Sequence, residues 1–360
     1  MNFARSPHII EIAETGQTGS KIELFLWNTG SQPTDPQYIL SKRIPASNQI
    51  ETYYNISPYV REYFTFTKWQ NATGLTYNID TSDNFIVQYA VKRYREVSGV
   101  YTLINTVTGT FCDGYGYYEE SYNPVAPSVL LDEGTYFYNY DASISTAQNN
   151  GVWGSFDIQM STGDSIKYTD LVDGSTITYV SASDGVKSFA RVYLTYAPNG
   201  NKVEYIVSGT TRWTAYFKPQ CEVKYQPVTV DFVNRYGSWS RIFFQKAKKR
   251  SINVKANEYK FNPKELPYIS QDIRQMQEFN INATETIKLN TGWVNDNYAE
   301  VLQQLMLSEK VLLCDYENNE DYAPVKVKTK SLQKQTGLND GMMNYTLDFD
   351  FAYNVINNVL

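Results

Sequence analysis

Residues 85–107 decide the fold class, and they read FIVQYAVKRYREVSGVYTLINTV. Apolar and polar side chains alternate through residues 85–97 and again through residues 100–107, which is the period-two pattern of β-strands. Ser98 and Gly99 between them have the turn chemistry of a tight β-hairpin. This stretch therefore predicts two long antiparallel strands joined by a two-residue turn.

The same pattern recurs along most of the chain, so we predict a mainly β protein. A second hairpin is predicted where strands at 186–196 and 202–207 flank Ala197-Pro198-Asn199-Gly200-Asn201. The other predicted strands are residues 22–27, 38–44, 49–54, 135–140, 154–160, 165–168, 175–180, 212–217, 222–225, 228–233, 240–244, 252–261, 277–289, 311–314, 325–327 and 345–353.

Two segments depart from this pattern and predict helices. Residues 56–64 predict one short helix, with Ser57 as its N-cap and Pro58 in its first turn. Residues 295–308 predict a second helix, because their apolar side chains recur at helical spacing. Those side chains are Val301, Leu302, Leu305 and Met306.

The length of 360 residues is enough for two or three domains. We predict two to three β-sandwich-like or β-barrel-like units, with one short helix in the N-terminal third and one helix in the C-terminal third. The boundaries we expect are an N-terminal β domain at 1–125, a middle β domain at 126–226 and a C-terminal β-rich domain at 227–360. The Pro-containing segment at 122–127 marks the first boundary, and Pro227 lies at the second.

The chain contains one histidine and 31 tyrosines. Histidine is the side chain best suited to exchange protons near neutral pH, and we expect His8 to lie near a mobile N-terminus. We therefore predict no catalytic residues and no enzyme activity. Tyrosine supplies large, rigid contact surface with one polar tip, which suits a protein that holds or recognises something.

Charge and cysteine content exclude further classes. A net charge of −6 gives no global attraction to nucleic acid, so we interpret the basic run at Lys246, Lys248, Lys249 and Arg250 as a solvated strand edge. Cys112, Cys221 and Cys314 are too widely spaced for a disulfide framework or a zinc site, and we expect reduced, buried thiols. Residues 1–7 lack the apolar core of a signal peptide, and no stretch reaches the roughly 20 apolar residues of a membrane helix. We expect synthesis in a cytosol, no membrane insertion and no sequence-specific nucleic-acid binding.

Carboxylates and tyrosines offer the remaining candidate sites. Asp113, Glu119 and Glu120 lie among aromatic residues, as in glycosidases, but we interpret them as a solvated loop. The oxygen-rich loops at 78–84 and 317–321 lack the glycine and terminal glutamate of an EF-hand, so no metal or cofactor is predicted. The tyrosine clusters at 115–118 and 136–140 fit cross-strand packing or a platform for sugars. We select as interface or structural positions Tyr115, Tyr117, Asn234, Tyr236, Gly237 and Trp239.

Two sets of residues resemble a known class of proteins. The first is RSPHIIEI at 5–12, YILSK at 38–42 and ISPYVREY at 56–63, and the second is DFVNRYGSW at 231–239 with residues 302–313 and the closing strands. They resemble virion structural proteins of tailed bacteriophages that infect Bacteroidota, the crAss-like phages among them. The resemblance covers the first and last thirds of the chain. It implies a tail, ring or baseplate component that assembles in the host cytoplasm, with no catalytic residues to carry over.

We therefore expect a non-enzymatic structural component of a bacteriophage tail, in its ring, hub or baseplate. It would form a homo-oligomer through β-rich, tyrosine-rich interfaces and contact other virion proteins of the tail, the portal-proximal region or the baseplate. Two alternatives stay open. One is a receptor- or glycan-binding module of the virion, and the other is a depolymerase that uses Asp113, Glu119 or Glu120.

Overall fold

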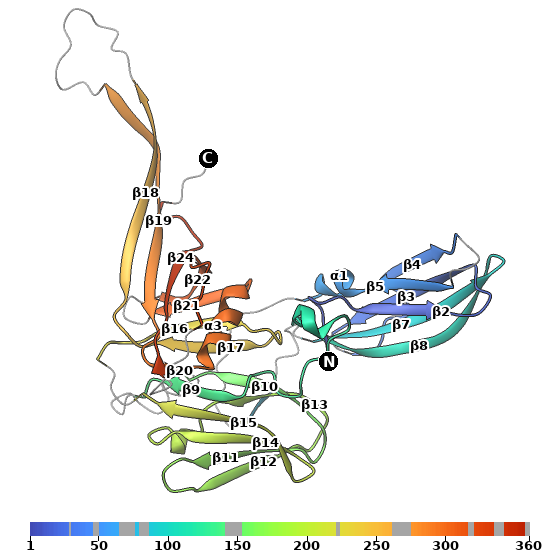
Figure 1. Cartoon of the computed structure of the whole chain (residues 1–360), viewed down its shortest axis with the longest axis horizontal. Helices are drawn as coiled ribbons and strands as arrows, with labels where there is room; N and C mark the ends of the chain where they lie inside the picture. The colour runs from blue at the N-terminus through green and yellow to red at the C-terminus, as the bar shows by residue number, and fades with distance from the viewer. Residues whose placement is uncertain are drawn as a thin grey trace, which may run out of the picture. The chain divides into compact units, whose positions relative to one another are not determined.

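The computed structural model describes residues 1–28, 30–45, 50–64, 76–78, 86–140, 153–220, 224–260, 275–315, 320–334 and 342–356 (Figure 1). Strands dominate these residues, with two α-helices, as the predicted fold class requires. The chain divides into two compact units, of which the first contains Met1–Gln220 with Phe232–Arg241, and the second contains Cys221–Asp231 with Ile242–Leu360. The predicted boundaries after residues 125 and 226 stay predictions.

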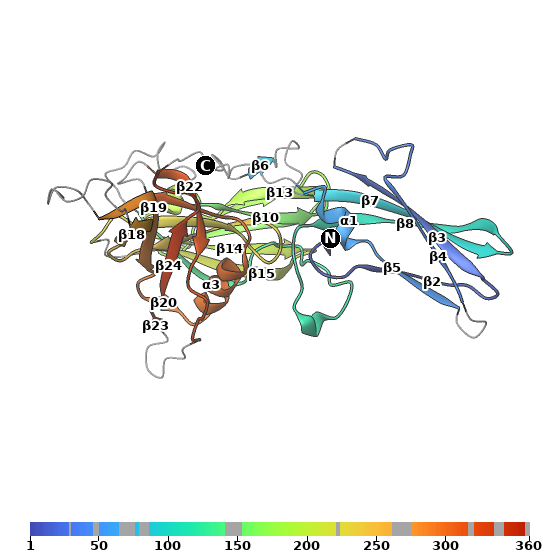
Figure 2. The ribbon, with the colours of Figure 1, turned by 90° about the horizontal axis from the view of Figure 1, so that it is seen from above.

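The hairpin predicted at 85–107 is present. Strand β7 (Ile86–Val97) pairs with β8 (Val100–Cys112) from Ile86 opposite Cys112 to Val97 opposite Val100 (Figure 2). Ser98 and Gly99 both have positive φ, 52° and 85°. Positive φ at both central residues is the geometry of a type I′ turn, whose twist matches that of the flanking strands.

This hairpin belongs to a five-stranded sheet in the order β1-β8-β7-β3-β4. The other members are β1 (Asn2–Phe3), β3 (Gly19–Trp27) and β4 (Tyr38–Arg43). β1 pairs in parallel with the end of β8, and the Ala4 amide then donates to the Cys112 carbonyl oxygen at 3.0 Å. The expectation of a mobile N-terminus is therefore wrong, because the first residues are hydrogen-bonded into the sheet.

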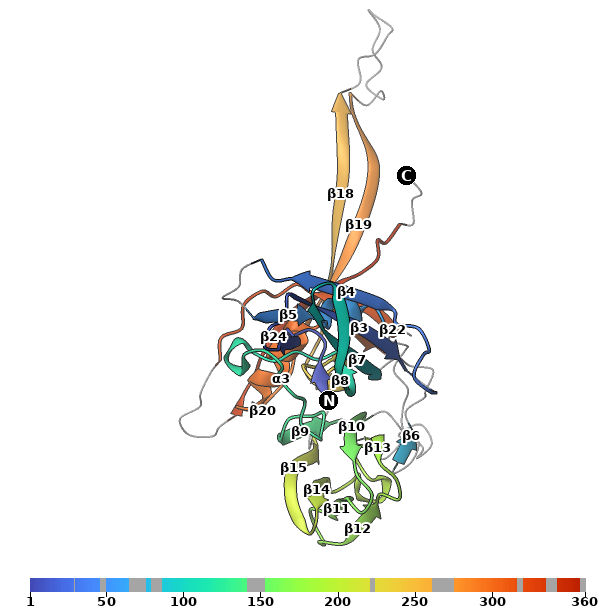
Figure 3. The ribbon, with the colours of Figure 1, turned by 90° about the vertical axis from the view of Figure 1, so that its right-hand side faces the viewer.

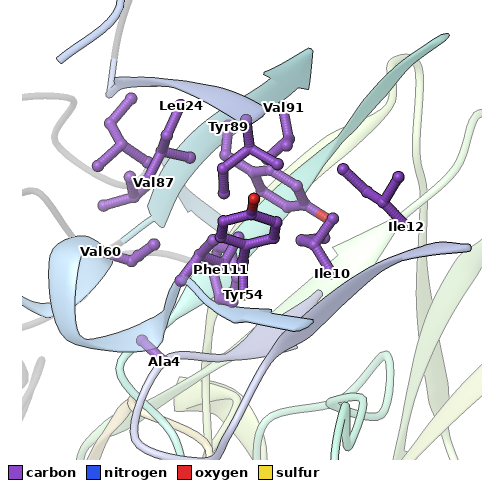
Figure 4. Packing of buried hydrophobic residues seen from close by; sticks show 13 residues of the cluster. Ala4, Ile10, Ile12, Leu24, Tyr54, Val60, Val87, Tyr89, Val91 and Phe111 are labelled. Atoms are coloured by element: carbon purple, nitrogen blue, oxygen red, sulfur yellow. The ribbon is translucent and has the colours of Figure 1, made fainter. Parts of the chain in front are cut away.

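Three elements enclose the first core. They are the five-stranded sheet, a two-stranded sheet of β2 (Ile9–Ala13) and β5 (Glu51–Asn55), and α1 (Ser57–Arg61). Figure 4 shows its side chains converging from these elements. Burying one Leu, Ile, Val or Phe side chain stabilises a fold by about 1.5–3 kcal/mol. The buried members are Ala4, Ile10, Ile12, Ile22, Leu24, Leu26, Tyr54, Ile56, Val60, Val87, Tyr89, Val91 and Phe111.

Helix α1 has Pro58 in its first turn, as predicted, but Ile56 and not Ser57 is its N-cap. The Ser57 hydroxyl is used elsewhere: it donates to the Ser6 carbonyl oxygen at 2.5 Å and accepts from the His8 amide at 3.0 Å. The Ser57 hydroxyl therefore links the N-terminal segment to α1 by long-range hydrogen bonds, and it does not cap the helix.

A β-sandwich follows in the first unit (Figure 3). One sheet has the order β12-β11-β14-β15-β9, and the other has the order β10-β13-β6. Phe156 of β10 stacks on Trp213 of β15 with ring centroids 5.4 Å apart, so the two sheets share an aromatic core. The strands are β6 (Thr76–Asn78), β9 (Gly134–Tyr138), β10 (Ser155–Met160), β11 (Ser165–Asp170), β12 (Thr176–Val180), β13 (Gly185–Ala190), β14 (Asn201–Val207) and β15 (Thr210–Pro219).

The hairpin predicted at Ala197–Asn201 is wrong. β13 ends at Ala190 and belongs to one sheet, whereas β14 begins at Asn201 in the other. The Asn201 side chain accepts from the Tyr193 amide at 3.0 Å and donates to the Arg191 carbonyl oxygen at 3.1 Å. These bonds hold the connection, which includes the 3₁₀ turn η2 (Leu194–Tyr196), in a crossover between the sheets.

The second unit is built on a seven-stranded sheet in the order β17-β16-β21-β22-β24-β19-β18. Its strands are β16 (Val228–Val233), β17 (Trp239–Phe244), β18 (Lys249–Lys260), β19 (Met276–Asn290), β21 (Val311–Asp315), β22 (Glu320–Val327) and β24 (Thr346–Phe351). Helix α3 (Tyr298–Leu307) buries Val301, Leu302 and Leu305 as predicted. It begins later than residue 295, because β20 (Val294–Asn295) pairs with β23 (Met342–Met343).

Cys112 and Cys314 are reduced, buried thiols, as expected, and burial raises the pKa of Cys112 to about 12. Cys221 and most of the oxygen-rich loops at 78–84 and 317–321 lie outside the described residues. None of the described helices combines the length and the apolar character that crossing a membrane requires.

Candidate interaction site

Five of the six selected residues belong to one contact inside the first unit. The segment at 113–117 packs against the turn at 234–237, and the Tyr115 amide donates to the Arg235 carbonyl oxygen at 2.8 Å. A Cβ on Gly237 would lie 2.8 Å from the Asp113 backbone, so only glycine fits there. The structure thus joins two segments that the sequence presents separately. Trp239, half-buried, opens β17 just beyond the turn.

Asn234 shapes this turn with its side chain. Its Oδ1 accepts from the Tyr236 amide at 2.9 Å and from the Ser238 amide at 3.1 Å, and its Nδ2 donates to the Leu130 carbonyl oxygen at 2.9 Å. Asparagine and glycine are favoured in turns because they satisfy local backbone groups and tolerate positive φ. Here Gly237 has φ 80°, so the two residues fix the turn together.

Arg235 links the turn to the tyrosines. Its guanidinium carbon lies 4.8 Å from the ring centre of Tyr117 and 4.9 Å from that of Tyr236, and its Nη2 lies 3.3 Å from Glu120 Oε1. The Tyr236 hydroxyl donates to Asp132, and burial raises the pKa of Tyr236. Burial likewise raises the pKa of Tyr115 to about 12. These tyrosines stay protonated at neutral pH and contribute packing and hydrogen bonds.

The three candidate carboxylates are separated by their environments. Asp113 is buried and accepts two hydrogen bonds from Arg5, each at 3.0 Å, so its interpretation as part of a solvated loop is wrong. Glu119 and Glu120 lie in the 3₁₀ turn η1 (Tyr118–Glu120) and are exposed. Because Arg5 donates to both carboxylate oxygens of Asp113, this ion pair stabilises the folded structure.

Asp157, which the sequence analysis did not select, joins the same turn to the β-sandwich. It accepts hydrogen bonds from the Ser188 and Ser238 hydroxyls, and burial raises its pKa. Nearby, the buried Arg191 donates to the Arg241 carbonyl oxygen at 2.6 Å and to the Ser240 hydroxyl at 2.8 Å. Only the contacts across sheets identify these residues, so no local sequence signal could have found them.

His8 is packed in the first core. Its ring makes edge contacts with Phe111 at 4.9 Å and Tyr89 at 5.9 Å between centroids. Burial lowers the pKa of His8 to about 4, so the imidazole is neutral at pH 7. Its role in this structure is packing.

Six exposed large apolar side chains lie on the β18–β19 ribbon of the second unit. β24 pairs with β19 only from Thr286 to Asn290, and beyond that point β18 and β19 pair with each other. From Ile252 to Lys260, at about 3.3 Å per residue, the ribbon projects roughly 30 Å past the sheet (Figure 1). Its exposed large apolar side chains are Ile252, Val254, Tyr259, Met276, Phe279 and Ile281.

This ribbon has the properties of a contact arm. A two-stranded ribbon alone is marginally stable in water, and clustered exposed apolar side chains indicate a surface that a partner covers. β18 is the edge strand of its sheet. The basic run that begins at Lys246 and ends at Arg250 leads into this strand, so it lies at a strand edge as predicted. Tyr259 of β18 and Phe279 of β19 pack edge to face, with ring centroids 5.7 Å apart, in the distal part of the ribbon.

A second open edge lies on β8. Its sequence, VYTLINTVTGTFC, contains no charged residue, and β1 covers only Phe111 and Cys112. Val100, Tyr101 and Leu103 are exposed near its start. Because charged side chains normally protect strand edges from pairing, an uncharged edge of this length favours contact with another strand.

The tyrosine clusters are largely covered by protein. Tyr136 and Tyr138 are buried, Tyr115 and Tyr117 are half-buried, and Tyr118 is exposed. The two clusters therefore pack mainly against their own unit.

Compared with models of protein families and with curated protein sequences, the chain matches none.

Proposed function

We propose that this chain is a non-enzymatic structural component of a bacteriophage tail, in its ring, hub or baseplate. It assembles in the host cytoplasm in several copies and contacts other proteins of the virion. The β18–β19 ribbon carries the proposal, because it presents apolar side chains and an open strand edge beyond its own sheet. Assembly proteins use such arms to pair with or pack on their neighbours.

The placement of the residues behind the resemblance supports this reading. Ser6 and Ser57 share a hydrogen bond, Arg5 binds Asp113, and Asp113 lies against Gly237. The RSPH, ISPY and NRYGSW stretches therefore meet in one hydrogen-bonded region of the first unit. Residues that meet inside a unit are expected to be shared by proteins with that structural framework.

The chemistry of the titratable groups also fits a structural role. His8 is held neutral in the core, and Asp113 is held by Arg5. Among the residues described, no group of three or more His, Cys, Asp or Glu side chains is arranged to hold a metal ion. A building block needs none of these groups to react.

Purified phage particles provide the test. Mass spectrometry of washed particles, with the major capsid protein as the internal standard, is expected to find several copies of the chain per particle. Gold-labelled antibody is expected to mark the tail. Recovery of the chain only in the lysate, with none in the particles, would overturn the proposal.

A further inference from the structure

One edge of the five-stranded sheet is open over most of its length. Strand β8 pairs with β7 on one side (Figure 1), and β1 covers only Phe111 and Cys112 on the other. In the part of the chain that the structure describes, residues 100–110 therefore have no second neighbouring strand. The outward N–H and C=O groups of such an edge are available to a further strand.

The residues of this open run favour pairing over exposure to water. They include no charged side chain, although charges, and lysine above all, normally keep strand edges apart. Val100 and Leu103 are 66% and 49% exposed. Ile104 and Val107 are only partly buried against the first core, so a strand added beside β8 would complete their cover.

The open run has one irregularity. Leu103 pairs with Tyr94 and Asn105 pairs with Arg93, which leaves Ile104 as an extra residue in β8. Such a bulge increases the local twist of its strand, so a partner strand must bend at the same point. The best-matched partner is a strand with the same bulge in its own open edge.

We propose that β8 pairs edge to edge with β8 of a second copy, antiparallel and about a two-fold axis. The inference deepens the proposed function and rests on it, since it names one contact through which copies assemble. Pairing of this kind forms a continuous sheet across two chains, in which main-chain hydrogen bonds supply the affinity. The same surface is used on both copies, as two-fold symmetry requires.

Other open edges of this chain fit β8 less well. β4 ends in Lys42 and Arg43, and β18 carries several charges, Lys255 and Glu258 among them. β12 has no charged residue, but it is five residues long and therefore shorter than the open run at 100–110. A charged edge that met its own copy would bring like charges together, whereas two β8 edges bring none. Length and charge therefore select a second β8.

One alignment satisfies the faces of the sheet and the bulge together. With Leu103 of one copy opposite Thr106 of the other, Tyr101 lies opposite Thr108. These four side chains share one face of the sheet, because their partners in β7 are alternate residues. The two bulges then coincide, and the paired run ends before Phe111, where β1 begins its own pairing.

Matched charge substitutions test this alignment. The basic variant carries Leu103→Lys with Thr106→Lys, and the acidic variant carries Leu103→Glu with Thr106→Glu. Both positions are exposed. Within either variant, like charges oppose each other twice in the two-fold contact. The dissociation constant for pairing is therefore expected to rise at least tenfold in sedimentation equilibrium experiments.

Mixing the two variants separates lost pairing from lost folding. In a mixed pair, each introduced lysine lies opposite an introduced glutamate. Equal amounts of the two variants are therefore expected to restore pairing, and native mass spectrometry is expected to find one copy of each variant in every pair. Misfolded variants would not recover on mixing. Failure of the mixture to pair would overturn the inference.

Two further variants complete the test. Thr106→Lys alone is a milder change, and it is expected to weaken pairing by a smaller factor while thermal unfolding stays unchanged. The matched control, Thr176→Lys with Thr178→Lys, places lysines at exposed positions of β12. It is expected to pair as strongly as the unmodified chain does. A larger loss of pairing in this control than in the β8 variants would overturn the inference.

The remaining outcomes each decide the inference. If the basic and acidic variants each pair as strongly as the unmodified chain, the inference is overturned and the proposed function stands. If the unmodified chain is monomeric at every concentration, both are overturned. If the variants pair normally and are also missing from phage particles, β8 binds a strand of another virion protein, and a second copy is excluded as its partner.

Discussion

Gly237 lies directly against the backbone of Asp113, although the two residues are far apart in sequence. A Cβ on Gly237 would lie 2.8 Å from both the amide nitrogen and the carbonyl carbon of Asp113. The φ of Gly237 is 80°, a value that side-chain-bearing residues rarely adopt. This contact joins the end of β8 to the turn between β16 and β17.

Gly237→Ala is expected to lower the free energy of unfolding by on the order of 3 kcal/mol. A positive φ costs alanine about 1 kcal/mol, and displacing packed backbone costs a further 1–3 kcal/mol, roughly. The matched control is Gly209→Ala, because Gly209 has φ 78° but no atom within 4 Å of its Cβ position. Urea unfolding of both variants gives the loss in free energy of unfolding for each, and the difference between the two losses measures the steric clash with Asp113. Equal losses in the two variants would contradict the close contact between Gly237 and Asp113.

Arg5→Met is expected to destabilise the protein by about 3–5 kcal/mol, because it leaves the buried Asp113 carboxylate without its partner. The double variant Arg5→Met with Asp113→Leu is expected to recover much of this loss, since no charge is then left buried. Glu120→Gln, which breaks the more exposed pair with Arg235, is expected to cost no more than about 1 kcal/mol. Chemical denaturation of all three measures the differences. A loss below 1 kcal/mol for Arg5→Met would contradict the account.

The stability of the protein is expected to depend on pH through His8. Burial lowers the folded-state pKa to about 4, whereas the unfolded value is 6.5, so the unfolded chain binds the proton more readily. Above pH 6.5 this difference in pKa makes its full contribution to the free energy of unfolding. As the pH falls toward 4 the contribution is lost, and the free energy of unfolding decreases by up to about 3 kcal/mol. His8→Phe keeps a ring against Phe111 and is expected to remove this part of the pH dependence. Parallel curves for both proteins between pH 7 and pH 4 would contradict it.

The apolar side chains of the ribbon are expected to serve assembly more than folding. Ile252→Ser with Val254→Ser removes two exposed apolar groups. The free energy of unfolding of the unassembled chain is therefore expected to change by less than about 1 kcal/mol, as measured by thermal unfolding. Its tendency to assemble is expected to fall at least tenfold. Ile22→Ser, in the first core, is the contrasting control, because it should impair folding itself. Unimpaired assembly of the ribbon variant would count against the ribbon as a contact arm.

Local turn chemistry was enough to predict some elements and not others. Ser98 and Gly99 predicted a hairpin correctly, because both residues accept positive φ and the flanking strands pair with each other. The Ala197–Asn201 stretch has equally good turn residues, but the Asn201 side chain and a change of sheet produce a crossover. The choice between hairpin and crossover depends on the sheet that each strand joins, which local pattern does not encode.

The selected residues illustrate a similar limit. Asn234 and Gly237 were selected as interface or structural positions, and in the structure they form a turn. That this turn packs against Asp113 and Tyr115 follows only from the tertiary structure, since the contact links segments more than a hundred residues apart. The ribbon was missed for a related reason. The sequence predicts two strands at 252–261 and 277–289, but not that β24 stops pairing with β19 at Thr286.

The mass of the purified chain in solution tests the central claim most directly. Light scattering over a range of protein concentrations, followed by negative-stain imaging, distinguishes the possibilities. We expect a defined multiple of the 41.3 kDa chain, with ring-shaped or regularly repeating particles. A mass of one chain at every concentration, with no repeating particles, would contradict the account of a structural component that assembles through its own exposed β-surfaces.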